Sequence, residues 1–140
     1  MPKILCVDHG EKRIGLAVSD LTGTIASPLT VINHVARTVD AAQVAGLAAE
    51  QGAEKIIVGQ SFDEEGNPNA AGRSAARCAE ALHGQTSLPG ERWDESLSTQ
   101  DARMARIQSG ASRKRRAGHP DSLAAVVILQ SYLEAMRNQK

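Results

Sequence analysis

The sequence predicts an α/β protein built on a mixed sheet, with helices covering both faces. Two observations support this. The first 32 of the 140 residues hold three strand-like segments in hairpin succession. After them the hydrophobic period changes, and helical and strand-like segments alternate. Hairpins give antiparallel neighbours and strand–helix–strand units give parallel ones, so the sheet should contain both kinds of pairing.

The three early strands are short and separated by turn residues. The first is an apolar run that ends in a carboxylate and reads as buried on both faces, whereas Pro28 indicates an edge or a bulge in the third. His9 falls in the first turn, and we interpret it as a turn residue without a catalytic role. The expected strands are Lys3–Asp8, Arg13–Ser19 and Thr24–Ile32.

The rest of the chain alternates between helices and strands. Two helices should each stop at a glycine, Gly52 and Gly84, which is a common helix terminator. The expected helices are Val39–Gln51, Asn69–His83, Ser98 to about Gln108, and a last one opening at His119–Asp121; the expected strands are Lys55–Gly59 and Thr86 to Glu95. The last helix has a candidate core-facing stripe of Leu123, Val126, Val127, Leu133 and Met136.

The resulting order, β-β-β-α-β-α-β-α-α, is that of the ribonuclease H-like fold. In that fold the first strand is central and the fourth lies parallel beside it, so we expect a five-stranded sheet in the order 3-2-1-4-5. The length of 140 residues and the absence of repeats predict a single domain, residues 1–140. Aromatic residues are only 2% of the chain, which argues against a nucleic-acid site made of aromatic stacking platforms.

Three acids stand where elements end or begin. Asp8 ends the first strand, Glu95 ends the fifth, and Asp121 begins the last helix. If strands one, four and five are parallel neighbours, these acids would meet at the carboxyl edge of the sheet, where open α/β sheets usually bind ligands. Clustered carboxylates could hold Mg²⁺ for phosphodiester hydrolysis.

Each acid also has an ordinary interpretation. Asp8 could start a turn, Glu95 could be a solvated surface acid, and Asp121 could favour the first turn of its helix. The spacing alone leaves both interpretations open.

The net charge of zero hides an asymmetry. Residues 1–100 carry 8 Lys and Arg against 13 Asp and Glu, whereas residues 101–140 carry 8 against 3. One stretch, which we call the basic stretch, has no acid among its cations and could attract a polyanion, or could be a solvated loop. Its cations are Arg103, Arg106, Arg113, Lys114, Arg115 and Arg116.

Three motifs resemble one known family. Residues 8–20, D-H-G-E-K-R-I-G-L-A-V-S-D, closely resemble the D-x-G-x-K-R-I-G-x-A-x-S-D motif of the YqgF/RuvX family. Residues 94–99, D-E-S-L-S-T, look like its D-E-R-L-[ST]-T motif. Arg115-Arg116 and the segment from Asp121 to Gln130 resemble its closing R-R … D-x-x-A-A-x-x-I-L-Q segment. The resemblance covers nearly the whole chain.

The resemblance implies a nuclease that processes the 5′ end of precursor 16S ribosomal RNA or, alternatively, a Holliday junction resolvase acting on branched DNA. It implies that Asp8, Glu95 and Asp121 are catalytic acids that bind Mg²⁺ or Mn²⁺, with two ions expected. Lys12 and Arg13 would then lie near substrate phosphates, and the basic stretch would hold the nucleic-acid backbone.

The chain departs from the family pattern in two places. Ser96 replaces the usual arginine, and the segment Val58–Gly66 lacks the usual Leu-Pro and carries three consecutive acids. Both changes affect expected substrate contacts, so a non-catalytic RNA-binding ribosome-assembly factor remains a third hypothesis.

The chain should be cytoplasmic and should not enter a membrane. Cys6 and Cys78 form no disulfide framework, no secretory signal is recognisable, and the longest apolar run, Ala124–Leu129, is too short to span a bilayer. The sequence leaves monomer and homodimer both open.

Overall fold

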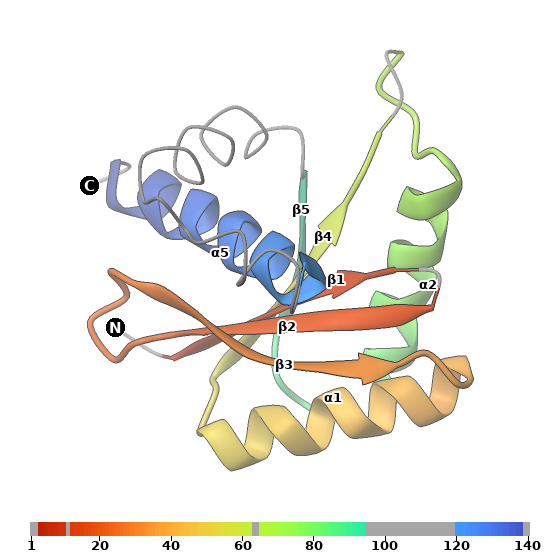
Figure 1. The fold of residues 1–140 in the computed structure, drawn as a ribbon, viewed down its shortest axis with the longest axis horizontal. Coiled ribbons are helices and arrows are strands. Elements are labelled where there is room, and N and C mark those ends of the chain that lie inside the picture. Colours follow the sequence, from red (N-terminus) through yellow and green to blue (C-terminus); the bar gives the residue numbers. More distant parts are fainter. Residues whose placement is uncertain (1–2, 11, 63–64, 95–119, 139–140) are drawn as a thin grey trace.

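The computed structural model describes residues 3–10, 12–62, 65–94 and 120–138. Within these ranges the chain forms five strands and three helices, shown in Figure 1. They are β1 (Ile4–His9), β2 (Arg13–Ser19), β3 (Ala26–Asn33), α1 (Arg37–Gln51), β4 (Lys55–Gln60), α2 (Ala70–His83), β5 (Gly90–Asp94) and α5 (Pro120–Asn138).

The five strands form one mixed sheet in the order β3-β2-β1-β4-β5, which confirms the predicted order. β1 is antiparallel to β2 and parallel to β4, and β4 is parallel to β5. The β2–β3 register shifts between Leu16 and Ala17, next to Pro28 on the edge strand β3, as the proline suggested.

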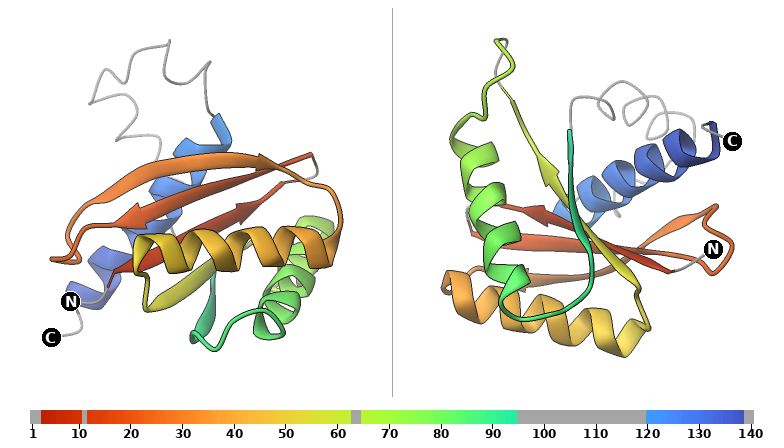
Figure 2. Two further views of the ribbon diagram at one scale, coloured as in Figure 1. Left: turned by 90° about the horizontal axis from the view of Figure 1, so that it is seen from below. Right: turned by 180° about the vertical axis from the view of Figure 1, so that it is seen from behind.

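Helices cover both faces of the sheet: α1 and α2 lie on one side and α5 on the other (Figure 2). Side chains alternate along β1, so Leu5 and Val7 enter the core under α1 and α2, whereas Ile4 and Cys6 enter the core under α5. All four are buried, which confirms the prediction of a strand buried on both faces.

Polar contacts fix the direction of α5 across the sheet. The Gln130 side chain accepts from the backbone N–H of Ala26 (3.1 Å) and donates to the carbonyl of Thr24 (3.0 Å). Two residues on, the Tyr132 hydroxyl accepts from Lys55 Nζ (2.6 Å), at the first residue of β4. Ser131 and Tyr132, in the later turns of α5, therefore lie over β4 and β5.

Some predicted boundaries were wrong. The fifth strand begins at Gly90, not at Thr86, because the backbone N–H of Thr86 donates to Leu82 (3.0 Å) and extends the end of α2 as a turn. β1 includes His9, whereas the sequence pattern predicts that His9 lies in the following turn. By contrast, Gly52 ends α1 with a left-handed φ of 67°, as a helix-terminating glycine should.

The buried stripe of α5 also differs from the predicted one. Only Leu133 of the five predicted residues is fully buried; Val126 and Met136 pack at the margin, and Leu123 and Val127 are half-buried. Ala125 faces the sheet, and its small side chain lets the helix approach closely. The predicted stripe contained only large apolar residues and therefore omitted Ala125. The observed stripe is Ala125, Ile128, Leu129, Tyr132 and Leu133.

The helix expected from Ser98 to about Gln108 and the basic stretch lie outside the described residues. Among the helices that the structure does describe, none combines the length and apolar character that crossing a membrane requires. Cys6 and Cys78 are both buried, and neither is in a disulfide.

The α5 stripe can be tested with two identical truncations. We expect Leu129→Ala to lower the free energy of unfolding by about 2–5 kcal/mol, because Leu129 is fully buried and its removal leaves a cavity. Leu123→Ala should cost about 1 kcal/mol or less, because Leu123 is only half-buried. Urea denaturation would measure both, and equal losses would contradict the observed stripe.

Candidate active site

Asp8 lies at the carboxyl end of β1, the central strand. Strand alternation places its side chain with those of Ile4 and Cys6, on the face that α5 covers. The residue is half-buried, and its register partner on β2 is Gly15, which has no side chain to place on that face. A rigid central strand therefore carries an acid at its end, beneath the helical layer formed by α5.

A tight turn follows β1 and positions two cations. The backbone N–H of Gly10 donates to the carbonyl of Arg13 (2.9 Å), and a Cβ at Gly10 would come within 2.5 Å of that oxygen. Only glycine fits this close approach without displacing the turn. Lys12 and Arg13, which leave the turn, are both exposed.

Asp121 lies in the first turn of α5, the helix that covers the same face of the sheet as Asp8. The structure describes its backbone but not its side chain. Glu95 lies outside the described residues. Trp93, two residues before Glu95, faces α5: its Nε1 donates to Ser131 Oγ (3.3 Å), and its ring stacks edge-on against Tyr132. The structure thus brings Asp8 and the start of α5 to one face.

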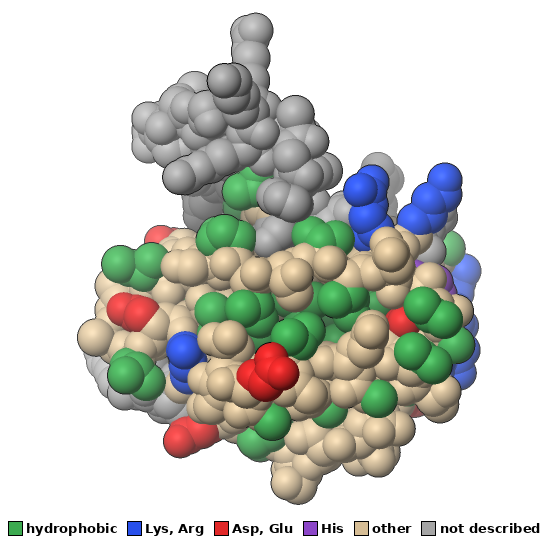
Figure 3. Space-filling view, turned by 60° about the horizontal axis from the view of Figure 1, so that its bottom comes forward, with side chains coloured by type: hydrophobic (Ala, Val, Ile, Leu, Met, Phe, Trp, Pro, Cys, Tyr) green, Lys and Arg blue, Asp and Glu red, His purple; other side chains and the backbone are tan. Residues whose placement is uncertain are grey.

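Exposed cations gather at the end of the molecule where β2 and α1 begin. Figure 3 shows Lys and Arg side chains at the right-hand end of its view. Arg37 of α1 and Arg77 of α2 line one cavity with His34, whose backbone N–H donates to the carbonyl of Lys12 (2.9 Å). Arg13 pairs with Asn33, next to His34, so these four cations lie at one end of the sheet. All six cations of the basic stretch lie outside the described residues.

Asp20, the last residue of the first motif, has a structural role. Its carboxylate accepts the Thr22 hydroxyl (2.6 Å) and the backbone N–H groups of Thr24 (2.9 Å) and Ile25 (3.2 Å). These bonds, led by that from Thr22, lower the pKa of Asp20 to about 2. The residue holds the β2–β3 turn and stays ionised at neutral pH.

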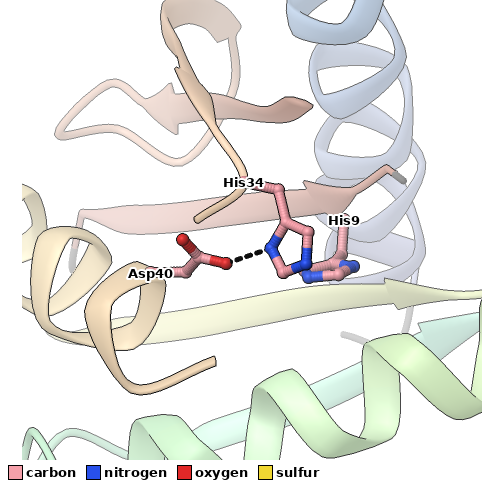
Figure 4. Close-up of side chains that lie close together, drawn as sticks. All are labelled: His9, His34 and Asp40. Atoms are coloured by element: carbon pink, nitrogen blue, oxygen red, sulfur yellow. Dashed lines mark hydrogen bonds and ion pairs between the residues drawn. The ribbon is translucent and has the colours of Figure 1, made fainter. Parts of the chain in front are cut away.

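The structure also brings together a group that the sequence did not predict: His9, His34 and Asp40 (Figure 4). His34 Nδ1 contacts one oxygen of Asp40, whose other oxygen accepts the backbone N–H of Val35 (3.0 Å). Asp40 is only 1% exposed. His9 points to the face opposite Asp8, because it follows Val7 in the alternation of β1.

One local signal could have found Asp40. It stands four residues before Val44 and eight before Ala48, on the buried stripe of α1, and an acid in an apolar stripe requires a partner. Nothing local pairs it with His9, which comes from a strand 31 residues earlier in the chain. Only the folded sheet places the two histidines beside one another.

These three residues line a cavity of about 200 Å³ together with Ala36, Arg37, Ser74, Arg77 and Cys78. Burial, then the charge of His34, lowers the pKa of His9. Its Nδ1 is a buried polar atom with no hydrogen-bond partner among the described residues. Burial, reinforced by Asp40, raises the pKa of the Cys78 thiol to about 11.

The mixed sheet in the order β3-β2-β1-β4-β5, with helices on both faces, is the ribonuclease H-like fold. RuvC of T. thermophilus, solved in complex with a Holliday junction, aligns with a TM-score of 0.69 over 99% of this chain and 97% of RuvC, at 17% identity. The Fowlpox virus resolvase, in complex with Holliday junction DNA, aligns with a TM-score of 0.55 over 96% and 98% of the two chains, at 11% identity. At these identities the likeness concerns the fold.

The family model described as "RuvX: Holliday junction resolvase" matches residues 2–135, and the chain belongs to this family. It is 36% identical over 138 residues to a protein of Syntrophus aciditrophicus (99% of this chain, 92% of the relative) and 37% identical over 138 residues to one of Thermoanaerobacter pseudethanolicus (98% and 99%). Both carry the name "Putative pre-16S rRNA nuclease". The chain is therefore a nuclease, a hydrolase acting on phosphodiester bonds.

The environment of Cys78 predicts an unreactive thiol. With a pKa raised to about 11, on the order of one molecule in a thousand carries the thiolate at pH 8, because the charged form appears only as the pH approaches the pKa. We expect iodoacetamide to modify the native protein slowly and the urea-unfolded protein rapidly, as followed by intact mass spectrometry. Rapid modification of Cys78 in the native protein would contradict the buried environment.

Proposed function

We propose that this chain, acting as one nuclease domain of residues 1–140 in the cytoplasm, processes the 5′ end of precursor 16S ribosomal RNA during ribosome biogenesis. The observation that carries the proposal is the position of Asp8 at the carboxyl end of the central strand, on the face of the sheet that α5 covers. The names of the two relatives, which align over nearly their whole length, indicate this substrate.

We propose Asp8, Glu95 and Asp121 as the metal-binding catalytic acids. Their donors are all carboxylate oxygens, the hard ligands that suit Mg²⁺ or Mn²⁺, and the half-buried Asp8 supplies one from a rigid strand. A pair of such ions, when bound, activates a water and neutralises the leaving oxygen of the phosphodiester. Asp8 would contribute a fixed negative charge, held in place by the hydrogen bonds of β1 to β2 and β4.

Substrate contacts would come from cations around this edge of the sheet. Lys12 and Arg13 follow the end of β1 by three and four residues, and both are exposed and could contact a phosphate backbone. The basic stretch (Arg103, Arg106, Arg113, Lys114, Arg115 and Arg116) would bind further phosphates. Ser96 and the acidic segment 63–65 would tune the choice of substrate rather than the metal site.

The family description supports a second candidate, cleavage of a four-way DNA junction. Resolving a junction requires two coordinated cuts, which a symmetric dimer would supply. Cleavage assays with a ribosomal RNA precursor and with a DNA junction, run side by side in Mn²⁺, would separate the two substrates. Preference for the junction by a dimeric protein would favour this second candidate.

Asp8→Asn tests the nuclease proposal. The change keeps the shape of the side chain but removes its charge, so cleavage of a precursor 16S rRNA fragment should fall at least about 100-fold, the scale of losing a principal charge-stabilising group. Gel analysis of the cleaved RNA in Mg²⁺ and in Mn²⁺ would measure it.

Asp20→Asn is the matched control, because its amide oxygen can still accept the backbone N–H of Thr24. It should retain cleavage. RNA binding by filter retention should be kept in Asp8→Asn, and circular dichroism should show that both variants fold. Full cleavage by Asp8→Asn would exclude Asp8 as a catalytic residue. RNA binding without metal-dependent cleavage by the wild type would support a non-catalytic assembly factor instead.

Lys12→Gln and Arg13→Gln test the proposed phosphate contacts. Each contact removed should lower the slope of log K against log salt by about one, because one phosphate fewer releases its counterions. Fluorescence anisotropy with a labelled RNA at several salt concentrations would measure the slope. Arg137→Gln, in the last turn of α5, is an exposed control that should leave the slope unchanged; an equal loss in Arg137→Gln would point to net charge rather than local contact.

A further inference from the structure

We propose that His9, His34 and Asp40 form a second metal site, for a borderline transition ion such as Zn²⁺, on the face of the sheet opposite Asp8. The three residues come from separate parts of the fold: the end of β1, the connection between β3 and α1, and the first turn of α1. Each offers one ligand atom, and these atoms all lie within 4.8 Å of one another.

This separation is close to what a metal needs. Zn²⁺ binds nitrogen and oxygen ligands at about 2.0–2.2 Å, so two ligands of a tetrahedral site are about 3.4 Å apart. The widest pair therefore has to close by at most about 1.4 Å, whereas His34 and Asp40, already in contact, have to move apart; side-chain rotation supplies both changes. His34 is the freest to move, because its side chain is 34% exposed, whereas that of Asp40 is only 1% exposed.

The buried Nδ1 of His9 is the observation that points to a ligand. A polar atom removed from water without a hydrogen bond loses stability, and the described part of the chain offers this nitrogen no partner. A contact between His34 and Asp40 would neutralise the buried carboxylate without any metal. That structural role explains two of the three residues and leaves His9 Nδ1 without a hydrogen bond. A metal bound through His9 Nδ1 and shared with His34 and Asp40 would give each of the three a partner.

Asp40 is already held as metal-binding carboxylates usually are. One of its oxygens accepts the backbone N–H of Val35 (3.0 Å), and the other faces His34. Such an outer hydrogen bond orients a ligating carboxylate and limits its motion. The site would also tie the end of β1 to the start of α1, at the strand end that carries Asp8 on its other face.

The ligand types distinguish this site from the three proposed catalytic acids Asp8, Glu95 and Asp121, which we call the acid set. Two imidazoles and one carboxylate suit Zn²⁺ and similar ions, whereas carboxylates alone suit Mg²⁺ or Mn²⁺. The adjoining cavity of about 200 Å³ leaves room for water to complete the coordination. Arg37 and Arg77 also line this cavity; both are exposed, so solvent and salt weaken their repulsion of a cation.

Calorimetric titration of Zn²⁺ into tag-free protein, stripped with a chelator, would test the site. We expect one tightly bound Zn²⁺ in the wild type and in Asp8→Asn, which leaves the second site intact. His34→Gln should weaken this binding by about 100-fold or more, because losing a ligand costs at least as much as losing an outer-shell partner. His83→Gln, at the exposed last turn of α2, is the matched control and should bind as the wild type does.

Thermal unfolding gives a second readout that does not depend on nuclease activity. Zn²⁺ should raise the Tm of the wild type, of Asp8→Asn and of His83→Gln, because an ion that binds only the folded state stabilises it. It should not raise the Tm of His34→Gln, which is compatible with folding because position 34 is partly exposed and the glutamine amide can still donate to Asp40. An excess of Mg²⁺ should not displace the bound Zn²⁺.

Three results would overturn the proposal. The first is unchanged Zn²⁺ affinity in His34→Gln. The second is loss of the tight site in Asp8→Asn, which would assign the ion to the acid set. The third is no Zn²⁺ binding together with stabilisation by inorganic phosphate, which would assign the cavity to an anion held by Arg37 and Arg77.

Discussion

The burial of β1 on both faces is the constraint on which the rest of the structure depends. This strand lies in the middle of the sheet, and alternate residues enter two separate cores, one under α1 and α2 and one under α5. Burial on both faces excludes water from its hydrogen bonds and leaves little freedom of register, because a shift by one residue would exchange the two faces. The end of the strand is therefore a rigid place from which to project functional side chains.

This alternation separates two kinds of chemistry on consecutive residues. Asp8 faces α5, where hard oxygen ligands are expected, and His9 faces the cavity beside α1 and α2, where nitrogen ligands predominate. A one-residue change of register would exchange these neighbours. The proposed nuclease centre and the proposed second metal site thus share one strand end while lying on opposite sides of the sheet.

The layer formed by α5 depends on polar as well as apolar contacts. Lys55, Glu91 and Tyr132 join β4, β5 and α5 at the starts of the two strands. Gln130 bonds two backbone groups at the start of β3, the N–H of Ala26 and the carbonyl of Thr24. Burial of the apolar surface of Leu129 and Leu133 stabilises the packing of α5 on the sheet. The directional hydrogen bonds fix the orientation of the helix on the sheet.

The sequence by itself determined the order of the described elements and the family, because hydrophobic period, terminating glycines and the motif at residues 8–20 are local features. The strand order followed from the likeness of the predicted element order to the ribonuclease H-like fold. It also placed Asp8 correctly at the end of the central strand. It misplaced the start of β5 and the stripe of α5, because both depend on what the segment packs against: the end of α2 in one case and the twisted sheet in the other. Only the tertiary structure brought His9 to His34 and Asp40, since their proximity comes from the pairing of β1, β2 and β3 and the return of the chain into α1, and no spacing along the sequence encodes it.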